Sequence, residues 1–440
     1  MMVRSQKLDG DEWWRPIPPG TSKDALHILA ARAVRAFADG FVSVLLPIYL
    51  LELGLSVLAI GSIITATLIG SALLTLWVGI FAHRHERRRM LLAACLLMAA
   101  TGAGFALASK FWPLLIVAFV GTMNPSSGDV SVFLPLEHTV LAQTIEPRRR
   151  TALFARYALA GTLAGAIGAL AASIPDLAVE RGGWTRLAAL QAMFGLYGAL
   201  GAAAFLLYLP LSPAVETVAQ AAPAPLRQSR GIVYGLAALF SIDAFGGGFF
   251  VQSLLALWLY QAYDLSVTTA ASILFWSSIF SAISYLLAVP ISERFGLINT
   301  MVFTHLPSNI FLILVPFAPN LATAICLLLA RSALSQMDVP TRSSYVMAVV
   351  TPQERPAAAS LTAVPRSFAS ALSPLLASYL LTLSTFGWPL VIGGALKAVY
   401  DLLLLVKFQK LRPPEEADAS ALSSHSGSPE SFSGASADDG

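Results

Sequence analysis

Apolar residues run along this chain in long blocks that are separated by short polar stretches. Twelve of these blocks approach or exceed the roughly twenty residues that a helix needs to cross a bilayer. In lipid every backbone N–H and C=O group needs an internal partner, so we expect helices rather than open strands. The expected spans are residues 24–52, 56–82, 90–109, 111–144, 152–174, 187–210, 231–261, 266–291, 298–318, 320–350, 357–383 and 388–408.

The composition supports the prediction of a polytopic membrane protein. The chain has 440 residues, of which 56% are hydrophobic and only 12% are charged, whereas about 25% are charged in an average soluble domain. Its two cysteines, Cys95 and Cys326, both fall within apolar blocks. We therefore expect two buried, inert thiols, with neither a disulfide nor a metal site.

Basic residues gather in the loops on one side of the predicted membrane. The loops after even-numbered spans carry eleven of them, and the opposite loops carry three. Because lysine and arginine favour the cytoplasmic side, we expect both termini to be cytoplasmic. The eleven are Arg84, Arg87, Arg88, Arg89, Arg148, Arg149, Arg150, Arg227, Arg230, Arg294 and Arg355; the three are Lys110, Arg181 and Arg186.

The chain also repeats itself. Gly40 matches Gly248 at an offset of 208, Arg84 matches Arg294 at 210, and the run EPRRR matches TPQER at 205. Such matches, in one order and with nearly one offset, predict two six-helix bundles with a binding site between them. The predicted parts are a cytoplasmic segment at 1–23, a first bundle at 24–211, a linker at 212–230, a second bundle at 231–410, and a disordered acidic, serine-rich tail at 411–440.

Two loops carry a family resemblance. The loop after the second span reads GIFAHRHERRRML over residues 79–91, and its counterpart reads ERFG over residues 293–296. With twelve spans and a 6+6 repeat, they resemble the major facilitator superfamily (MFS), whose pattern here is Gly-x-Leu-Ala-Asp-Arg-x-Gly-Arg-Lys. The resemblance implies a bacterial-type permease with the all-α MFS fold, although His83 replaces the aspartate of the pattern. It assigns a cytoplasmic gate to Gly79, Arg84, Arg87, Arg88, Glu293, Arg294 and Gly296.

Charged residues inside the spans point to a functional site, because the bilayer penalises each by at least about 2.5–3.5 kcal/mol. Arg35 and Asp243 lie at matching positions of the first and seventh spans, near the membrane midplane. We expect them to face each other across the cavity or to share a substrate; a buried ion pair that only fixes packing is the alternative. Asp39 lies one turn after Arg35 and could neutralise it within the helix.

The tenth and fourth spans carry further cavity candidates. Arg331, Ser335 and Asp338 follow one helical stripe, and Pro340 predicts a break in the tenth span. Asp129 of the fourth span is expected at a depth in the membrane similar to that of Asp338. The full set of predicted substrate or proton residues is Arg35, Asp39, Asp129, Asp243, Gln252, Arg331, Asp338 and Arg366, with plain packing or ion pairing as the alternative.

Other polar residues in the spans have simpler interpretations. We expect Arg32 to reach the headgroups at the inner surface. Lys397 and Asp401 are one turn apart on a peripheral helix, so we expect them to neutralise each other. His305 and Asn309 are expected to hydrogen-bond to each other or to the region of Pro307. The glycines of GTLAGAIGAL (161–170) are expected to allow close helix packing.

These features predict a secondary active transporter of a small solute that works by alternating access. Proton coupling is favoured because several acids are embedded in the membrane. Export is slightly favoured over uptake. The sequence has no phosphate-binding loop and no nucleophile or zinc motif, so neither direct ATP use nor an enzyme is expected.

The predicted partners are a small molecule, protons and the lipid bilayer. No cofactor, metal or nucleic acid is expected, and the protein should be a monomer in the plasma membrane of a bacterium. Acidic and basic candidates balance, so the charge of the substrate stays open, with a slight preference for an amphiphilic or anionic solute. A non-transporting receptor or assembly factor on the same fold is the alternative.

Overall fold

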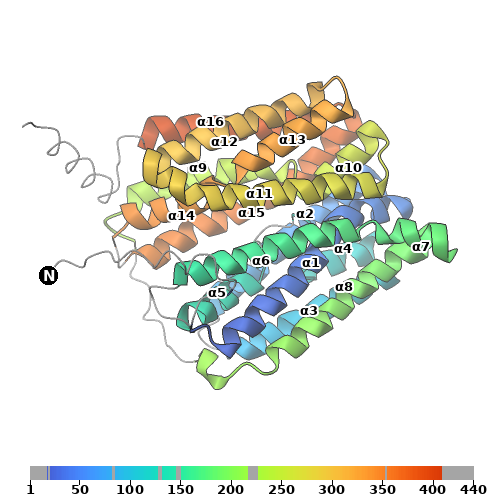
Figure 1. The fold of residues 1–440 in the computed structure, drawn as a ribbon, viewed down its shortest axis with the longest axis horizontal. Coiled ribbons are helices and arrows are strands. Elements are labelled where there is room, and N and C mark those ends of the chain that lie inside the picture. The colour runs from blue at the N-terminus through green and yellow to red at the C-terminus, as the bar shows by residue number, and fades with distance from the viewer. Residues whose placement is uncertain are drawn as a thin grey trace, which may run out of the picture.

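The computed structural model describes residue 17 and residues 20–81, 85–126, 131–144, 150–216, 226–351 and 354–408. Within these ranges the regular structure is helical (Figure 1). Ten helical segments there are long and apolar enough to cross a membrane. The other two predicted spans correspond to α15 and to a helix that is broken between α4 and α5. The predicted all-α polytopic fold is therefore confirmed.

The first bundle contains six of the expected spans. Ser22 caps the first helix, because its hydroxyl accepts a hydrogen bond from the backbone N–H of Ala25 at 3.1 Å. Thr185 caps α8 in the same way. The helices are α1 Lys23–Glu52, α2 Val57–Phe81, α3 Arg87–Leu107, α4 Phe111–Val120, α5 Phe133–Gln143, α6 Arg150–Ala171, α7 Ile174–Gly182 and α8 Arg186–Tyr208, followed by the 3-10 turn η3 Pro213–Glu216.

The second bundle repeats this plan. Ser266 and Asn320 cap two of its helices through side-chain oxygens. The helices are α9 Arg230–Gly248, α10 Gln252–Tyr263, α11 Val267–Phe295, α12 Leu297–Leu314, the 3-10 turn η4 Val315–Phe317, α13 Leu321–Ser335, α14 Asp338–Val349, α15 Arg355–Leu383 and α16 Trp388–Phe408.

The molecule has two distinct ends along its long axis. The first helix begins and α16 ends at the left in Figure 1, which we call the terminal end. Helix α7 lies at the right, which we call the α7 end. The chain therefore returns to the side from which it entered the bundle, as an even number of spans requires.

Helix packing has the same pattern in both bundles. In the first bundle α1 packs on α6 and α3 on α8; in the second α9 packs on α15 and α12 on α16. Glycines allow close approach of α1 to α6 and of α9 to α15. A side chain at Gly40 would overlap the backbone carbonyl of Gly165, and one at the matching Gly248 would overlap that of Ser370. Gly168 likewise approaches the carbonyl of Phe37, so the expected close packing of the 161–170 glycines is observed.

In the described part of the chain, buried apolar residues join the bundles at the α7 end. The largest core cluster combines Phe41 and Leu45 of α1 with Leu254 and Trp258 of α10, and so belongs to both bundles. This core lies toward the α7 end, where α1 packs directly on α10. Toward the terminal end each bundle has its own cluster. Among the described residues, the cores are thus shared at the α7 end and separate at the terminal end.

Several spans are interrupted inside the bundles. The fourth span is non-helical at residues 121–126 and 131–132, and the tenth at Gln336 and Met337. The second interruption agrees with the break predicted from Pro340, which lies in the first turn of α14. Non-helical backbone is tolerated at membrane depth where protein or water surrounds it, so these breaks direct attention to the space between the bundles.

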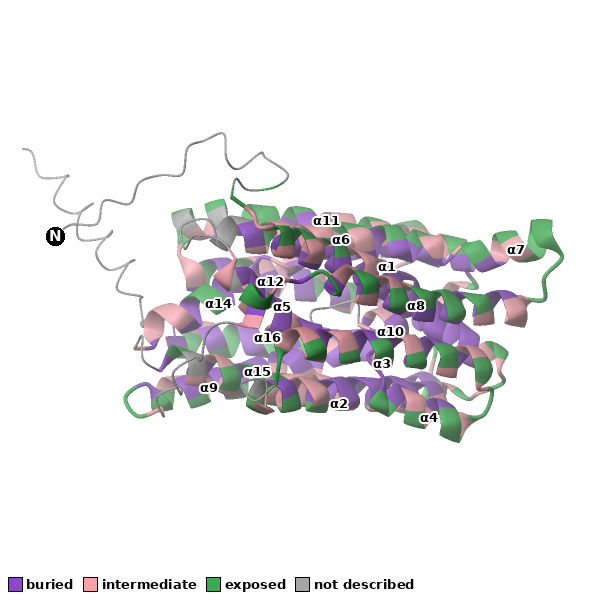
Figure 2. Cartoon of the chain, turned by 90° about the horizontal axis from the view of Figure 1, so that it is seen from below, coloured by how far each residue is buried: buried purple, intermediate pink, exposed green. Residues whose placement is uncertain are grey.

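The outer faces of the bundles are apolar. Figure 2 shows exposed and intermediate residues along the outside of the helices and buried residues between them. Trp112, Ile116 and Val406 are among the large exposed apolar residues, as expected of a surface that lipid covers. Cys95 is buried, but Cys326 in α13 is exposed; the prediction of two buried thiols is wrong for Cys326, because an apolar lipid-facing position needs no burial in protein.

Candidate functional site

A polar cavity of about 200 Å³ lies between the two bundles. The first bundle contributes Arg32 and Asp39 of α1 and Thr162 of α6. The second contributes Gln252 of α10 and Ser281 of α11. Because both bundles build its walls, any relative movement of the bundles changes the cavity.

The charged residues of the cavity are held by α1 and its neighbours. Asp39 accepts a hydrogen bond from the backbone N–H of Asn124 and interacts electrostatically with Arg32 and Arg35. The guanidinium of Arg32 lies 5.2 Å from the ring centroid of Tyr157 and is buried. The expectation that Arg32 reaches the headgroups is therefore wrong: Arg32 turns into the protein, where a ring and the Asp39 carboxylate compensate its charge.

The interrupted fourth span connects the cavity to the second bundle. Ser253 donates to the carbonyl of Pro125 through both its hydroxyl, at 2.8 Å, and its backbone N–H, at 3.2 Å. Nearer the α7 end, Thr268 donates to Asp176 at 3.2 Å and also joins the bundles. These contacts flank the cavity on the side of the shared core.

Arg35 is neutralised within the first bundle. Its guanidinium lies 2.5 Å from a carboxylate oxygen of Glu137 in α5 and 3.8 Å from the ring centroid of Phe133. The hydroxyls of Tyr157 and Tyr208 each donate to Glu137 at 2.6 Å. This carboxylate therefore has three partners from three other helices, as a buried charge requires.

Asp243 is neutralised within the second bundle. Its two oxygens lie 3.0 Å from Arg342 of α14 and 2.5 Å from Lys397 of α16. Arg342 also pairs with Asp338 one turn earlier, at 2.5 Å. The predicted meeting of Arg35 and Asp243 is therefore wrong, since each has its partner inside its own bundle.

A histidine extends the network of the second bundle. His305 lies 2.8 Å from Asp401 through Nδ1 and 3.8 Å from Asp243 through Nε2. Asn309 donates to Asp401 at 2.9 Å and lies 3.2 Å from His305, so the expected contact of His305 with Asn309 is observed. The predicted pairing of Lys397 with Asp401 is wrong, because the flexible lysine reaches Asp243 on another helix instead.

The sequence interpretation missed two central residues, Glu137 and Arg342. Both are buried, in contact with the residues that had been singled out. A signal was available, since Glu137 and Arg342 are 205 residues apart, which is the offset of the repeat in this region.

The remaining predicted cavity residues have different surroundings. Arg331 lies over the ring of Phe250, with 4.8 Å to the centroid. Arg366 in α15 is exposed and close enough to interact electrostatically with Asp243, Asp338 and Arg342. Asp129 lies outside the described residues.

Two residues of the predicted gate contact neighbouring parts of the first bundle and the turn that follows it. The backbone N–H groups of Arg87 and Arg88 donate to Glu216 at 2.7 and 2.9 Å. The Arg87 side chain donates to Gln143 and Val215, and that of Arg88 to the carbonyl of Leu209. These contacts tie the start of α3 to the chain that leaves the bundle.

The other gate residues lie at the ends of α2 and α11. Gly79 is in α2, and Glu293 and Arg294 are in the last turn of α11. Gly296 follows with φ of 82°, a left-handed conformation that favours glycine. Arg84 lies outside the described residues. A clamp between the bundles by this set stays a prediction.

A carboxylate anchors the start of the second bundle. Glu354 accepts hydrogen bonds from the backbone N–H groups of Arg227, Gln228 and Ser229, at 2.6, 2.8 and 2.9 Å. These hydrogen bonds favour the ionised form and lower the pKa of Glu354 to about 2. The loop before α15 is thereby tied to the chain that enters α9.

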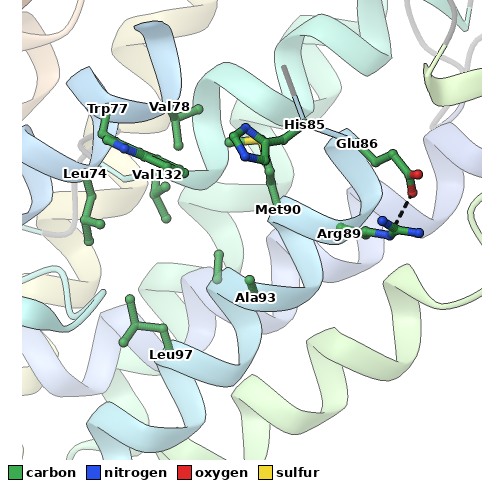
Figure 3. A pocket seen from close by; sticks show the side chains of 11 residues that line it. Leu74, Trp77, Val78, His85, Glu86, Arg89, Met90, Ala93, Leu97 and Val132 are labelled. Atoms are coloured by element: carbon green, nitrogen blue, oxygen red, sulfur yellow. Dashed lines mark ion pairs between the residues drawn. The ribbon is translucent and has the colours of Figure 1, made fainter. Parts of the chain in front are cut away.

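A second cavity, of about 470 Å³, lies between α2 and α3 of the first bundle. Figure 3 shows mainly apolar walls, with Trp77 and Met90 near His85, and an ion pair of 3.0 Å between Glu86 and Arg89 at one edge. The second bundle contributes nothing to this lining among the described residues. The cavity between the bundles is therefore the better candidate for a site that bundle movement controls.

Comparison with known proteins agrees with this architecture. Over 422 residues the chain is 24% identical to the uncharacterized membrane protein YJR124C of Saccharomyces cerevisiae, covering 88% of this chain and 94% of that one. A mutant of the nucleoside transporter NupG superposes with a TM-score of 0.69 at 14% identity, covering 88% of this chain and all of the other. The inward-open xylose transporter XylE of E. coli gives 0.67 at 15% identity, covering 90% and 99%.

At these identities the two structures establish likeness of fold. The family model described as Major Facilitator Superfamily matches residues 28–253 and 236–434, and so spans nearly the whole chain. Together with the twelve spans and the two bundles, this match means that the chain belongs to the major facilitator superfamily.

Proposed function

We propose that this protein is a secondary active transporter that moves a small solute by alternating access through the cavity between the bundles. The observation that carries the proposal is the arrangement of cores: one core joins the bundles at the α7 end, and two separate cores support them at the terminal end. Separate cores let the bundles part at one end without exposing either core. A rocking motion about the cavity would then expose it to each side in turn.

The contacts around the cavity support a state that is closed toward the α7 end. Ser253 binds the Pro125 carbonyl and Thr268 binds Asp176, both across the bundle interface. The excess of arginine in loops at the terminal end favours a cytoplasmic position for that end. A carrier in this state exposes its cavity to the cytoplasm. We propose export as its direction, as the sequence predicts. A bacterial plasma membrane stays the predicted location.

Proton coupling has its best support in the second bundle. His305 lies between the carboxylates of Asp401 and Asp243, and Asp243 also binds Lys397 and Arg342. With His305 neutral, its Nδ1–H donates to Asp401 and its Nε2 faces Asp243; protonation would give both carboxylates a charged donor. Asp243 could then exchange partners between the histidine and the two cations, which lie on different helices.

Transport assays in liposomes test this proposal. The purified protein is reconstituted, a pH gradient is imposed, and the accumulation of radiolabelled glucose, uridine, succinate and choline is followed. We expect the neutral, the anionic or the cationic solutes of this panel to accumulate, and a protonophore to abolish the accumulation. In Asp243→Asn, coupled accumulation should be lost while solute exchange without a gradient persists.

Two results would contradict parts of the proposal. Unaltered coupling in Asp243→Asn would exclude this network as the proton site. Absence of both accumulation and exchange across the whole panel would contradict the transporter proposal and favour the receptor or assembly factor.

A further inference from the structure

The cavity between the bundles has an unusually polar lining for a site inside a membrane. Nine of its eleven lining residues carry polar or charged side chains, and only Ala36 and Gly161 do not. An apolar or amphiphilic solute would meet mainly polar side chains on the walls. The preference for an amphiphilic solute, taken from the sequence alone, is therefore not supported by this lining.

The charges of the described part of the lining balance. Among the described lining residues, Arg32 is the cation and Asp39 the anion, and the two interact electrostatically. They are seven residues apart on α1, which places them about 10 Å apart along the helix axis on one face. A solute with a net charge would leave one charge uncompensated in a buried site, which is costly, whereas a neutral solute would leave the balance intact.

Several polar groups are free to bind a solute. Within the described part of the chain, the side chains of Gln252 and Ser281 make no hydrogen bond to protein. Ser278 donates to the carbonyl of Leu274 at 2.9 Å, so its oxygen still accepts. Gln336 offers a further amide, whose nitrogen makes one long hydrogen bond of 3.4 Å to Ser335. Amides and hydroxyls that both donate and accept match the hydroxyl groups of a solute, which also do both.

The size of the cavity limits the solute further. Its volume of about 200 Å³ lies below the roughly 300–1,000 Å³ of sites that enclose drug-sized ligands. From size, charge balance and lining together we infer that the transported solute is a small, uncharged, polyhydroxylated molecule, recognised by Gln252, Ser281 and Gln336. This inference rests on the proposed transport function and names the class of solute for that same cavity.

Binding to the purified, full-length protein in detergent tests the inference. Thermal stabilisation is titrated with glucose and uridine as neutral polyhydroxylated probes, succinate as an anion and choline as a cation. We expect a neutral probe to stabilise the protein and both charged probes to have no effect. Gln252→Ala and Gln336→Ala should each weaken the affinity about tenfold, the effect of losing one or two hydrogen bonds.

A matched control lies on the same helix. Gln261 is also in α10 but does not line the cavity, so Gln261→Ala should leave the affinity unchanged. The unliganded melting temperature of each variant shows whether it is folded, and Gln252→Asn, which keeps the amide, should retain more affinity than Gln252→Ala.

The outcomes separate this inference from the transport proposal. The inferred class of solute is overturned if succinate or choline stabilises the protein. It is also overturned if neither glucose nor uridine does. If a charged probe nevertheless accumulates in liposomes, the transporter proposal stands and only the class is wrong. Equal loss of affinity in Gln252→Ala and Gln261→Ala would also overturn the inference, because it would show that binding does not occur at the cavity.

Discussion

Asp243 lies 3.0 Å from Arg342, and this ion pair is the charge-reversed counterpart of the pair between Arg35 and Glu137. Asp243 follows Arg35 by 208 residues and Arg342 follows Glu137 by 205, so the acid and the base have exchanged helices between the repeats. Each pair joins the first helix of its bundle to the broken fourth helix. Because each pair lies within its own bundle, a rocking motion need not separate a buried ion pair.

Removing the charge of Asp243 should destabilise the protein. Asp243→Asn leaves Lys397 and Arg342 buried with less compensation, and breaking a buried ion pair costs about 3–5 kcal/mol. We expect a clear fall in the melting temperature of the purified protein. Asp264→Asn is a matched control, since Asp264 is exposed and its φ of 49° suits asparagine. Equal melting temperatures for the two variants would contradict a buried pair.

The hydroxyl of Tyr208 should contribute to the first bundle. It donates to Glu137 at 2.6 Å, and a hydrogen bond to a charged group contributes about 1.5–3 kcal/mol. Tyr208→Phe should therefore lower the free energy of unfolding by about this amount. The exposed Tyr234 gives the control variant Tyr234→Phe, which should change stability little. An unchanged free energy of unfolding in Tyr208→Phe would show that the Glu137 carboxylate is not stabilised by this hydrogen bond.

The contact of Ser253 with Pro125 should hold the α7 side closed. Ser253→Ala removes the 2.8 Å hydrogen bond from the hydroxyl but keeps the one from the backbone. A net contribution of about 1 kcal/mol corresponds to a several-fold increase in opening. Hydrogen exchange of the α10 backbone should rise by this factor. Ser343→Ala, which loses only a bond to its own helix, should leave α10 unchanged; similar exchange in both variants would count against the role of Ser253.

The anchor at Glu354 should depend on pH. Its folded pKa of about 2 lies below the ordinary value of 4.5, so Glu354 stabilises the fold above pH 4.5 and loses this effect as the pH falls toward 2. The melting temperatures of wild type and Glu354→Gln should differ at neutral pH and converge on acidification. Glu52→Gln, at a half-exposed pair 3.8 Å from Arg186, is the control and should have little effect. A difference that grows below pH 4.5 would contradict the sign.

The sequence predicted the spans well and the partners of the buried charges poorly. Apolar blocks and polar punctuation determine where helices begin and end, because lipid leaves the backbone no other partner. Which charges meet depends on how helices rotate and pack. Lys397 and Asp401 have the spacing of a pair within a helix, yet the lysine binds Asp243 and the aspartate binds His305.

The candidate site was predicted in part. Asp39 and Gln252 do line the cavity between the bundles. Arg32 does not reach the headgroups as expected, because its side chain is buried against Tyr157. The direction of a side chain around the helix axis follows from packing with other helices, which one sequence does not reveal.

Alternating access changes a distance across the α7 end, which can be measured. Spin labels at Leu177→Cys in α7 and Ala262→Cys in α10, both at exposed positions, report on the two bundles after Cys95 and Cys326 are replaced by serine. Pulsed electron paramagnetic resonance in liposomes would then be measured at acidic and neutral pH. We expect two distances, a short one for the closed state and a longer one for the open state, in proportions that change with pH. A single short distance under both conditions would contradict alternating access.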